Sequence, residues 1–221
     1  MCQSYAGFFI MRYKHKKIFH VPWSKGLTRD DKIHKDMDFF VGKNIVVTEK
    51  MDGENTSIYN DYTHARSVDS KYHPSRAWVR NFYSKIRHNI PDGWRVCGEN
   101  LYAIHSIYYK NLKDYFLAFS VWDKNNFCLS WEDTEKFAES AGIKTVDVLY
   151  KGVYREDILK TLYSTHSLNG DECEGYVIRL ADSFSYHEFE KCVAKFVREN
   201  HVSTDSHWMF RQFKINELKN D

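Results

Sequence analysis

Short runs of β-branched and aromatic residues recur along this 221-residue chain and limit its fold more than any other feature. Each run is five to eight residues long, which is typical of strands. The runs are NIVVTE at 44–49, TSIYN at 56–60, RVCGE at 95–99, YFLAFSVW at 115–122, EGYVIRL at 174–180 and CVAKFV at 192–197. The sequence therefore predicts at least six strands.

Helical periodicity occurs in fewer places. The predicted helices cover residues 75–89, 131–141 and 155–166. In the first, Trp78, Phe82 and Ile86 recur at every fourth position and share one face. Ser130 and Asp133 resemble a capping box at the start of the second. Because strands outnumber helices and do not alternate with them regularly, we expect an α+β fold of largely antiparallel sheets flanked by helices.

Composition and charge exclude several classes of protein. Hydrophobic residues make up 43% and charged residues 28%, which excludes a disordered chain, and only 10 Gly and 3 Pro exclude a collagen-like or low-complexity one. The net charge of +2 is small, but positive charge is concentrated in residues 12–35 and 61–95, while 155–190 is acidic. Clustered basic charge suits phosphate groups and also suits a plain solvated surface.

Cysteine usage and hydropathy bear on location. The five cysteines are scattered and form no CxxC pair, so neither a zinc site nor a disulfide framework is indicated, and we expect free thiols in a reducing compartment. No stretch approaches the roughly 20 apolar residues that a membrane helix needs. We therefore expect a soluble, cytoplasmic protein without a membrane partner. Walker A and GxGxxG sequences are absent, which excludes the common P-loop and Rossmann nucleotide sites.

The segment EKMDGENT at 49–56 is the candidate for chemistry. Lys50 follows a predicted strand, and Asp52-Gly53 is a turn dipeptide before the next strand. A tight turn would hold the lysine amine in a fixed direction, as a covalent nucleophile requires. The alternative is a plain β-hairpin closed by an Asp-Gly turn.

The surrounding segments decide between these alternatives. Lys50–Gly53 fits the KxDG motif and resembles the nucleotidyl acceptor of the covalent nucleotidyltransferases, the superfamily of polynucleotide ligases and mRNA capping enzymes. Five further segments resemble the motifs of this superfamily in its order: ARS at 65–67, CGENLY at 97–102, YFLAFSVWD at 115–123, EGYVIR at 174–179 and VAKFVR at 193–198. The flanks FHVPWSKG at 19–26 and ENHVSTDSHW at 199–208 are similar to those of small RNA ligases.

The resemblance implies a role for each matched residue. Lys50 would attack the α-phosphate of ATP and carry AMP as a phosphoramidate. Lys195 would stabilise the phosphates with a bound Mg²⁺ (or Mn²⁺), which Glu174 would position directly or through water. Glu99 would bind the ribose hydroxyls, with Arg66 nearby.

Further roles follow from the same resemblance. Phe119 is expected to stack on the adenine, with Phe116 on the same strand face; a core position is the alternative for Phe119. Asn55 is expected to act on the RNA 5′-phosphate end. Asp52 would tune the amine or the metal-bound waters, or only shape the turn. The last motif usually has two lysines at alternate positions, whereas valines stand two residues before and two residues after Lys195. Arg198 is the candidate second cation if the strand bulges, and the alternative is a family branch that uses one lysine.

Taken together, the resemblance implies an ATP-dependent RNA ligase that joins 3′-hydroxyl and 5′-phosphate ends in RNA repair. Residues 1–221 would form a single nucleotidyltransferase domain, because the 26 residues after Lys195 are too few for the OB-fold of DNA ligases and capping enzymes. We expect a monomer, supplied with ends by a separate kinase or phosphatase. A minimal DNA ligase and a nucleic-acid-binding module with a decayed active site are the alternatives, and the sequence leaves ATP or GTP open.

Overall fold

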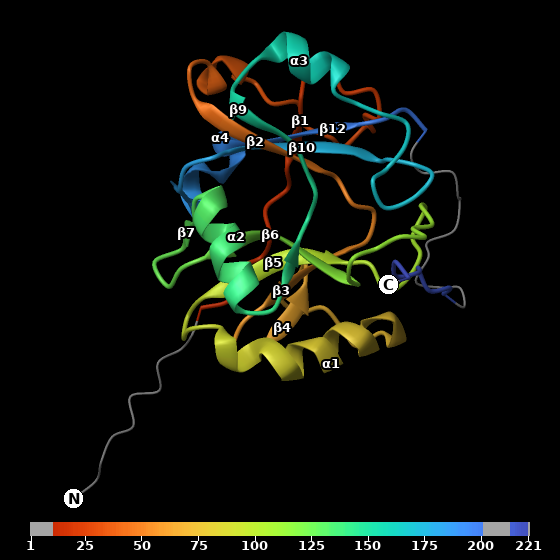
Figure 1. Cartoon of the computed structure of the whole chain (residues 1–221). Coiled ribbons are helices and arrows are strands. Elements are labelled where there is room, and N and C mark those ends of the chain that lie inside the picture. The colour runs from red at the N-terminus through yellow and green to blue at the C-terminus, as the bar shows by residue number, and fades with distance from the viewer. Residues whose placement is uncertain (1–10, 201–212, 221) are drawn as a thin grey trace, which may run out of the picture.

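Two β-sheets form the centre of the computed structural model, which describes residues 11–200 and 213–220 (Figure 1). The five-stranded sheet has the order β1-β12-β10-β2-β9. Its strands are β1 (Phe19–His20), β12 (Val193–Val197), β10 (Gly175–Leu180), β2 (Asn44–Glu49) and β9 (Val148–Val153). All its neighbours are antiparallel except β1, which runs parallel to β12.

The seven-stranded sheet has the order β11-β7-β6-β5-β3-β4, and β8 pairs with β6 off this path. Its strands are β11 (Phe184–Ser185), β7 (Phe127–Cys128), β6 (Phe116–Trp122), β5 (Arg95–Asn100), β3 (Glu54–Ile58), β4 (Thr63–Ala65) and β8 (Lys144–Thr145). Only the β6–β8 pair is parallel. The expected α+β fold with largely antiparallel sheets is thus confirmed.

Short helices surround the sheets. The α-helices of the described residues are α1 (Ala77–Ile86), α2 (Trp131–Ser140), α3 (Glu156–Thr161) and α4 (Phe189–Cys192). Single 3₁₀ turns lie at Met37–Phe40, Pro74–Arg76, Arg87–Asn89 and Tyr186–Glu188. Helix α1 covers the outer face of the seven-stranded sheet, and α3 lies beyond the other sheet (Figure 1). The predicted apolar face of α1 is confirmed, since Trp78, Phe82 and Ile86 pack in one cluster with Phe116 of β6.

The six predicted strands are all present, with small shifts at their ends. Strand β9 escaped prediction because its residues are half-buried or exposed at the sheet edge, which removes the apolar alternation that marks a strand. The helix expected at 155–166 ends at Thr161, and this prediction was wrong in its second half. Residues Ser164 and Thr165 instead enter a loop in which the amide of Cys173 donates to the carbonyl of Thr165.

Apolar packing holds the two sheets together and leaves room between them. Trp122 of β6 and Tyr176 of β10 belong to one buried cluster, so both sheets contribute to the same core. Cys97, Cys128, Cys173 and Cys192 are free and buried. No helix in the described part of the chain is long and apolar enough to cross a membrane. The motif segment at 199–208 lies almost wholly outside the described residues.

Candidate active site

The segment after β2 crosses from one sheet to the other. Strand β2 pairs with β10 and β9, whereas β3 pairs with β4 and β5, so residues 50–53 do not close a hairpin and that alternative is wrong. Asp52 fixes the crossing: its Oδ2 accepts from the amides of Ser106 at 2.7 Å and Ile107 at 2.8 Å. A Cβ at Gly53 would lie 2.6 Å from the carbonyl oxygen of Asn100, so only glycine fits this close approach. The end of β2 is therefore held rigidly between the sheets.

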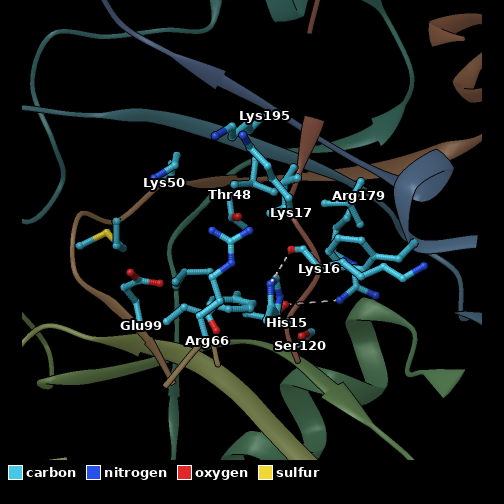
Figure 2. A pocket seen from close by; sticks show the side chains of 18 of the residues that line it. His15, Lys16, Lys17, Thr48, Lys50, Arg66, Glu99, Ser120, Arg179 and Lys195 are labelled. Carbon is cyan, nitrogen blue, oxygen red and sulfur yellow. Dashed lines mark hydrogen bonds between the residues drawn. The ribbon is translucent and has the colours of Figure 1, made fainter. Parts of the chain in front are cut away.

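A cavity of about 620 Å³ opens at this crossing. Both sheets line it, with Lys50 and Lys195 on the side of β2 and β12 and Glu99 on the opposite side (Figure 2). Six residues selected from the sequence share this lining: Lys50, Asn55, Arg66, Glu99, Phe119 and Lys195. Segments spread over 145 positions of sequence thus meet at one site.

Lys50 and Glu174 form the closest charged pair at the cavity. The lysine Nζ donates to Oε2 of Glu174 at 2.5 Å, and the two side chains are 23% and 6% exposed. Burial would lower the pKa of Lys50, but the attraction of Glu174 and Glu99 outweighs it and raises this pKa above its ordinary value. Burial also raises the pKa of Glu174, although less than it would without the lysine. The amine is therefore protonated when the cavity holds no phosphate.

Glu99 and Lys195 have strongly shifted pKa values. Burial, together with repulsion from Glu174, raises the pKa of Glu99 to about 8 against the attraction of Lys50. A carboxyl group that keeps its proton donates as well as accepts hydrogen bonds, which suits a partner rich in hydroxyl groups. Burial and repulsion from Lys50 lower the pKa of Lys195 to about 8, so it still carries most of its charge at pH 7.

Oxygen donors at the cavity fit a divalent cation. Mg²⁺ and Mn²⁺ bind nucleotide sites through one or two carboxylates, phosphate oxygens and water. The buried carboxylate of Glu174, next to Lys50, is such a donor. Among the described residues, no group of three or more His, Cys, Asp or Glu side chains is arranged to hold an ion without a substrate.

Phe119 lies at the apolar end of the cavity. It is the extra residue where the β5–β6 register shifts, since Cys97 pairs with Ser120 and Gly98 with Ala118. Phe119 lines the cavity, while Phe116 packs in the core beneath α1. The prediction that the two rings share a face was wrong, because residues three apart on a strand point to opposite faces. After Phe119, the shift turns Ser120 and Trp122 toward the cavity as well. The guanidinium of Arg179, which is buried, donates to the carbonyl of Phe119 at 3.4 Å and supports this bulge.

Asn55 and Arg66 lie on the seven-stranded side of the cavity. Asn55 pairs with Glu99 in the β3–β5 register, and its Oδ1 is buried without a hydrogen-bond partner in the described part of the chain. Arg66 follows β4, is exposed overall, and extends its guanidinium into the cavity (Figure 2). Both therefore present polar groups to whatever fills the cavity.

Asp52, Glu174 and Arg198 lie outside the lining, and Glu174 joins the site through its hydrogen bond with Lys50. The Asp52 carboxylate is engaged by two loop amides, as described above. Strand β12 does not bulge, because Lys195, Phe196 and Val197 pair in unbroken register with β10. Arg198 lies beyond the strand and pairs with Glu172 at 2.5 Å. The condition under which Arg198 would be the second cation is thus not met.

Sequence reasoning missed an N-terminal group that also lines the cavity: His15, Lys17 and Asp31. These residues precede the first recognised motif, and His15 lies edge-on to Phe119 at 5.4 Å between ring centroids. The basic cluster at 12–35 was the one available signal. Its charge indicated phosphate binding but did not distinguish one lysine from the next.

Comparison with known proteins identifies one matching sequence family and several solved structures with a similar fold. The sequence profile of the family described as RNA ligase matches residues 43–197. A search of curated protein sequences found no match. Among solved structures, a Naegleria gruberi RNA ligase with PPi is similar at a TM-score of 0.58 and 18% identity, covering 85% of this chain and 61% of that one. A point mutant of that ligase with ATP and Mn is similar at a TM-score of 0.56 and 16% identity, covering 83% and 61%. The likeness establishes the fold, and the chain spans about three fifths of the length of these structures.

Proposed function

The chain belongs to the RNA ligase family, and we propose that it joins RNA 3′-hydroxyl and 5′-phosphate ends in an ATP-dependent reaction. One observation carries the proposal: the amine of Lys50 borders a 620 Å³ cavity that also exposes Glu99 and Lys195, with Glu174 at 2.5 Å from the amine. A lone amine would be an ordinary surface charge. An amine between buried carboxylates and beside a second lysine suits attack on a phosphate.

In the first step, the nitrogen of Lys50 forms a bond to the α-phosphorus of ATP while the bond to the bridging oxygen breaks. Pyrophosphate leaves with the bonding electrons, and Lys50 carries AMP as a phosphoramidate. The amine must first lose its proton. The Glu174 hydrogen bond opposes this loss, so a ligand that draws Glu174 away lowers the pKa of Lys50 and activates it.

Glu174 is the proposed contact to that ligand, a Mg²⁺ or Mn²⁺ ion. When bound, the metal would neutralise phosphate charge and compete with the lysine for the carboxylate. The similar ligase structures that contain ATP and Mn support this proposal. Lys195 would stabilise charge on the phosphates, and Glu99 with Arg66 would hold the ribose. Phe119 would stack on the adenine, since its ring borders the apolar end of the cavity.

The later steps move AMP to RNA and then release it. The 5′-phosphate of RNA attacks the phosphorus of lysyl-AMP and Lys50 leaves, giving RNA-adenylate. The 3′-hydroxyl then attacks the RNA 5′-phosphorus and AMP leaves. We propose that Asn55 acts on the 5′-phosphate end, because it borders the cavity and its buried Oδ1 is an unused acceptor in the described part of the chain. Asp52 serves this site indirectly, by holding the crossing.

One experiment tests the proposed function against two alternative functions. A minimal DNA ligase shares the same first step, and a decayed binding module would lack it. Lys50, Glu99 and Lys195 at one cavity oppose decay. Incubation with α-labelled ATP or GTP and Mg²⁺, followed by denaturing electrophoresis, tests the first step directly. Label that survives denaturation with ATP supports the proposal, and label with GTP alone would change the cofactor. No adduct with either nucleotide would overturn it.

The biological setting is part of the same proposal. We propose a monomer of one nucleotidyltransferase domain that repairs broken RNA, with ends prepared by a separate kinase or phosphatase. Four free, buried cysteines support a reducing compartment such as the cytoplasm. Sedimentation of the purified chain, alone and with a nicked RNA, tests the monomer.

A further inference from the structure

We infer that Lys17, from the segment before β1, is the second phosphate-binding cation of this site and contacts the β- and γ-phosphates of ATP. The inference rests on the proposed function. It supplies the cation that β12 lacks, since Lys195 is flanked at alternate positions by Val193 and Val197.

The register of β1 brings Lys17 to Lys195. Strand β1 runs parallel to β12 with His20 opposite Lys195, and the amide of Val21 donates to the Lys195 carbonyl at 2.8 Å. Lys17 lies three residues before His20 and lines the cavity. Figure 2 shows its side chain directed to the same part of the cavity as that of Lys195. Their charges interact, since Lys17 helps to lower the pKa of Lys195.

Asp31 holds Lys17 in this position. One carboxylate oxygen lies 3.2 Å from the lysine Nζ, and the other accepts from the amide and hydroxyl of Thr28. The Lys17 Nζ also donates to the carbonyl of Asp30 at 2.6 Å. Burial would raise the pKa of Asp31, but the Thr28 and Lys17 hydrogen bonds lower it below its usual range, so the carboxylate stays ionised. The Lys17 side chain thus lies at the cavity beside Asp31, and 37% of its surface is exposed.

Strand β12 has no room for a second lysine at position 197. Val197 packs under the turn at residues 24–26: the amide of Gly26 donates to its carbonyl at 2.8 Å, and a Cβ on Gly26 would lie 2.8 Å from its Cγ1. Val193 packs in the apolar core with Phe189 and also borders the cavity. A charge at position 197 would be buried without a partner, and the residue present at position 193 carries no charge. The N-terminal segment reaches the phosphate end without this cost.

A second cation near Lys195 would help to neutralise the negative charge of the leaving pyrophosphate. Lys50 must be neutral to attack, which leaves Lys195 to face a leaving pyrophosphate of several negative charges. Arg66 approaches the cavity from the seven-stranded side, opposite Lys195 (Figure 2). Lys16 directs its ammonium to the ring of Tyr186, at 4.7 Å from the centroid. Lys17 is therefore the neighbouring cation best placed to stabilise the leaving pyrophosphate together with Lys195.

Binding measurements in a Lys50→Ala protein separate this role from chemistry, because that protein forms no adduct. Titration calorimetry with ATP and with AMP, each with Mg²⁺, compares Lys17→Ala with its parent. A charge-assisted contact removed from the β- and γ-phosphates should weaken ATP binding by about 10- to 100-fold. AMP binding should change less than about twofold, which also shows that the variant is folded. Lys17→Arg should keep most of the ATP affinity. Lys14→Ala, an exposed lysine of the same segment, is the matched control and should match the parent.

In the protein with Lys50 intact, Lys17→Ala should slow adduct formation and the reversal of the adduct by pyrophosphate. The same variant should seal pre-adenylated RNA at the rate of its parent. Equal ATP affinity in Lys17→Ala and its parent would overturn the inference while an adduct on the unaltered protein upholds the proposed function. Equal losses for ATP and AMP would also overturn it. No adduct and no ATP binding in any protein would overturn the proposed function and the inference together.

Discussion

The ammonium of Lys50 lies 2.5 Å from a carboxylate oxygen of Glu174, a residue 124 positions later in the chain. The antiparallel register of β2 and β10 produces this contact, because Glu49 pairs with Tyr176 and the two strand ends meet at the cavity. The hydrogen bond to Glu174 keeps the Lys50 amine protonated and fixes its direction. In the proposed mechanism, separation of the pair lowers the pKa of Lys50, so that the amine loses its proton and can attack.

Lys50→Ala should abolish the adduct with labelled ATP. The substitution removes the attacking nitrogen but no core volume, and Glu174 can take up a proton once its partner is gone. We therefore expect the free energy of unfolding to change by no more than about 1–2 kcal/mol. Denaturing electrophoresis measures the adduct and urea titration the stability. Lys110→Ala, which removes an exposed lysine paired with Asp171, should keep the adduct. An adduct in Lys50→Ala would move the nucleophile elsewhere.

Glu174→Gln should make Lys50 easier to deprotonate and yet slow its adenylation. The neutral amide no longer attracts the ammonium, so the pKa of Lys50 falls, while the proposed metal loses its carboxylate. Reaction of Lys50 with an amine reagent, followed by mass spectrometry across pH, should show a lower midpoint. Adenylation should fall by about 10²-fold or more. Glu172→Gln alters a carboxylate that is 59% exposed outside the cavity and should change neither measurement. Faster adenylation in Glu174→Gln would contradict a role in metal binding.

Local pattern predicted the strands well because strands such as β2, β6 and β12 are buried along nearly their whole length, which gives continuous runs of β-branched and aromatic residues. It failed at residues 50–53, where Asp52-Gly53 has the composition of a hairpin turn but the flanking strands join different sheets. Strand pairing depends on distant partners, and the local sequence of a turn does not contain them. The bulge at Phe119 has the same origin, since a register shift depends on the facing strand and reverses which side chains reach the cavity.

The resemblance to a known family brought Lys50, Glu99 and Lys195 into the candidate site, whereas it did not reach the N-terminal side. Lys50 follows β2, and Glu99 and Lys195 lie within β5 and β12. Lys17 and Asp31 belong to a segment with one two-residue strand, and the parallel pairing of β1 with β12 brings this segment to the cavity. Arg198 was selected because it lies close to Lys195 in the sequence. Strand β12 is regular, however, and Arg198 pairs with Glu172 outside the cavity.

Asn55→Ala should spare adenylation and impair sealing. The side-chain oxygen of Asn55 is buried and unpaired in the described part of the chain, so its removal costs no internal hydrogen bond. Adduct yield should stay within about twofold, and sealing of a 5′-phosphate RNA should fall by about 10-fold or more. Asn81→Ala, on the exposed face of α1, should leave both unchanged. Loss of adenylation before sealing would contradict the assignment of Asn55 to the RNA end.

Stability should fall as pH drops from about 6.5 to about 4, because of His15 and His20. Burial lowers the pKa of each from 6.5 to about 4, so in this window the unfolded chain binds protons that the folded chain excludes. At the acid end of this pH window, each histidine lowers the free energy of unfolding by up to about 3 kcal/mol. His15→Gln should flatten the decline by about the share of one histidine, since glutamine does not titrate. Urea titrations at pH 4.5 and 7 measure the difference. Equal declines in both proteins would show that His15 takes up its proton without penalty.

The choice between RNA and DNA must come from the sugar beside the break. Any phosphate bound by the basic segments 12–35 and 61–95 is common to RNA and DNA, so charge does not discriminate between them. The attacking 3′-hydroxyl has to align with the leaving AMP, and sugar pucker sets its direction; a misplacement of about 1 Å costs roughly 10²-fold. We therefore expect ribonucleotides to be required on the 3′-hydroxyl side of the break, whereas the 5′-phosphate strand can be DNA. Matched nicked substrates with two terminal ribonucleotides or two deoxyribonucleotides at the 3′-hydroxyl end measure the preference, with adduct formation as the common control. Equal sealing rates on the two would overturn the RNA assignment and favour a minimal DNA ligase.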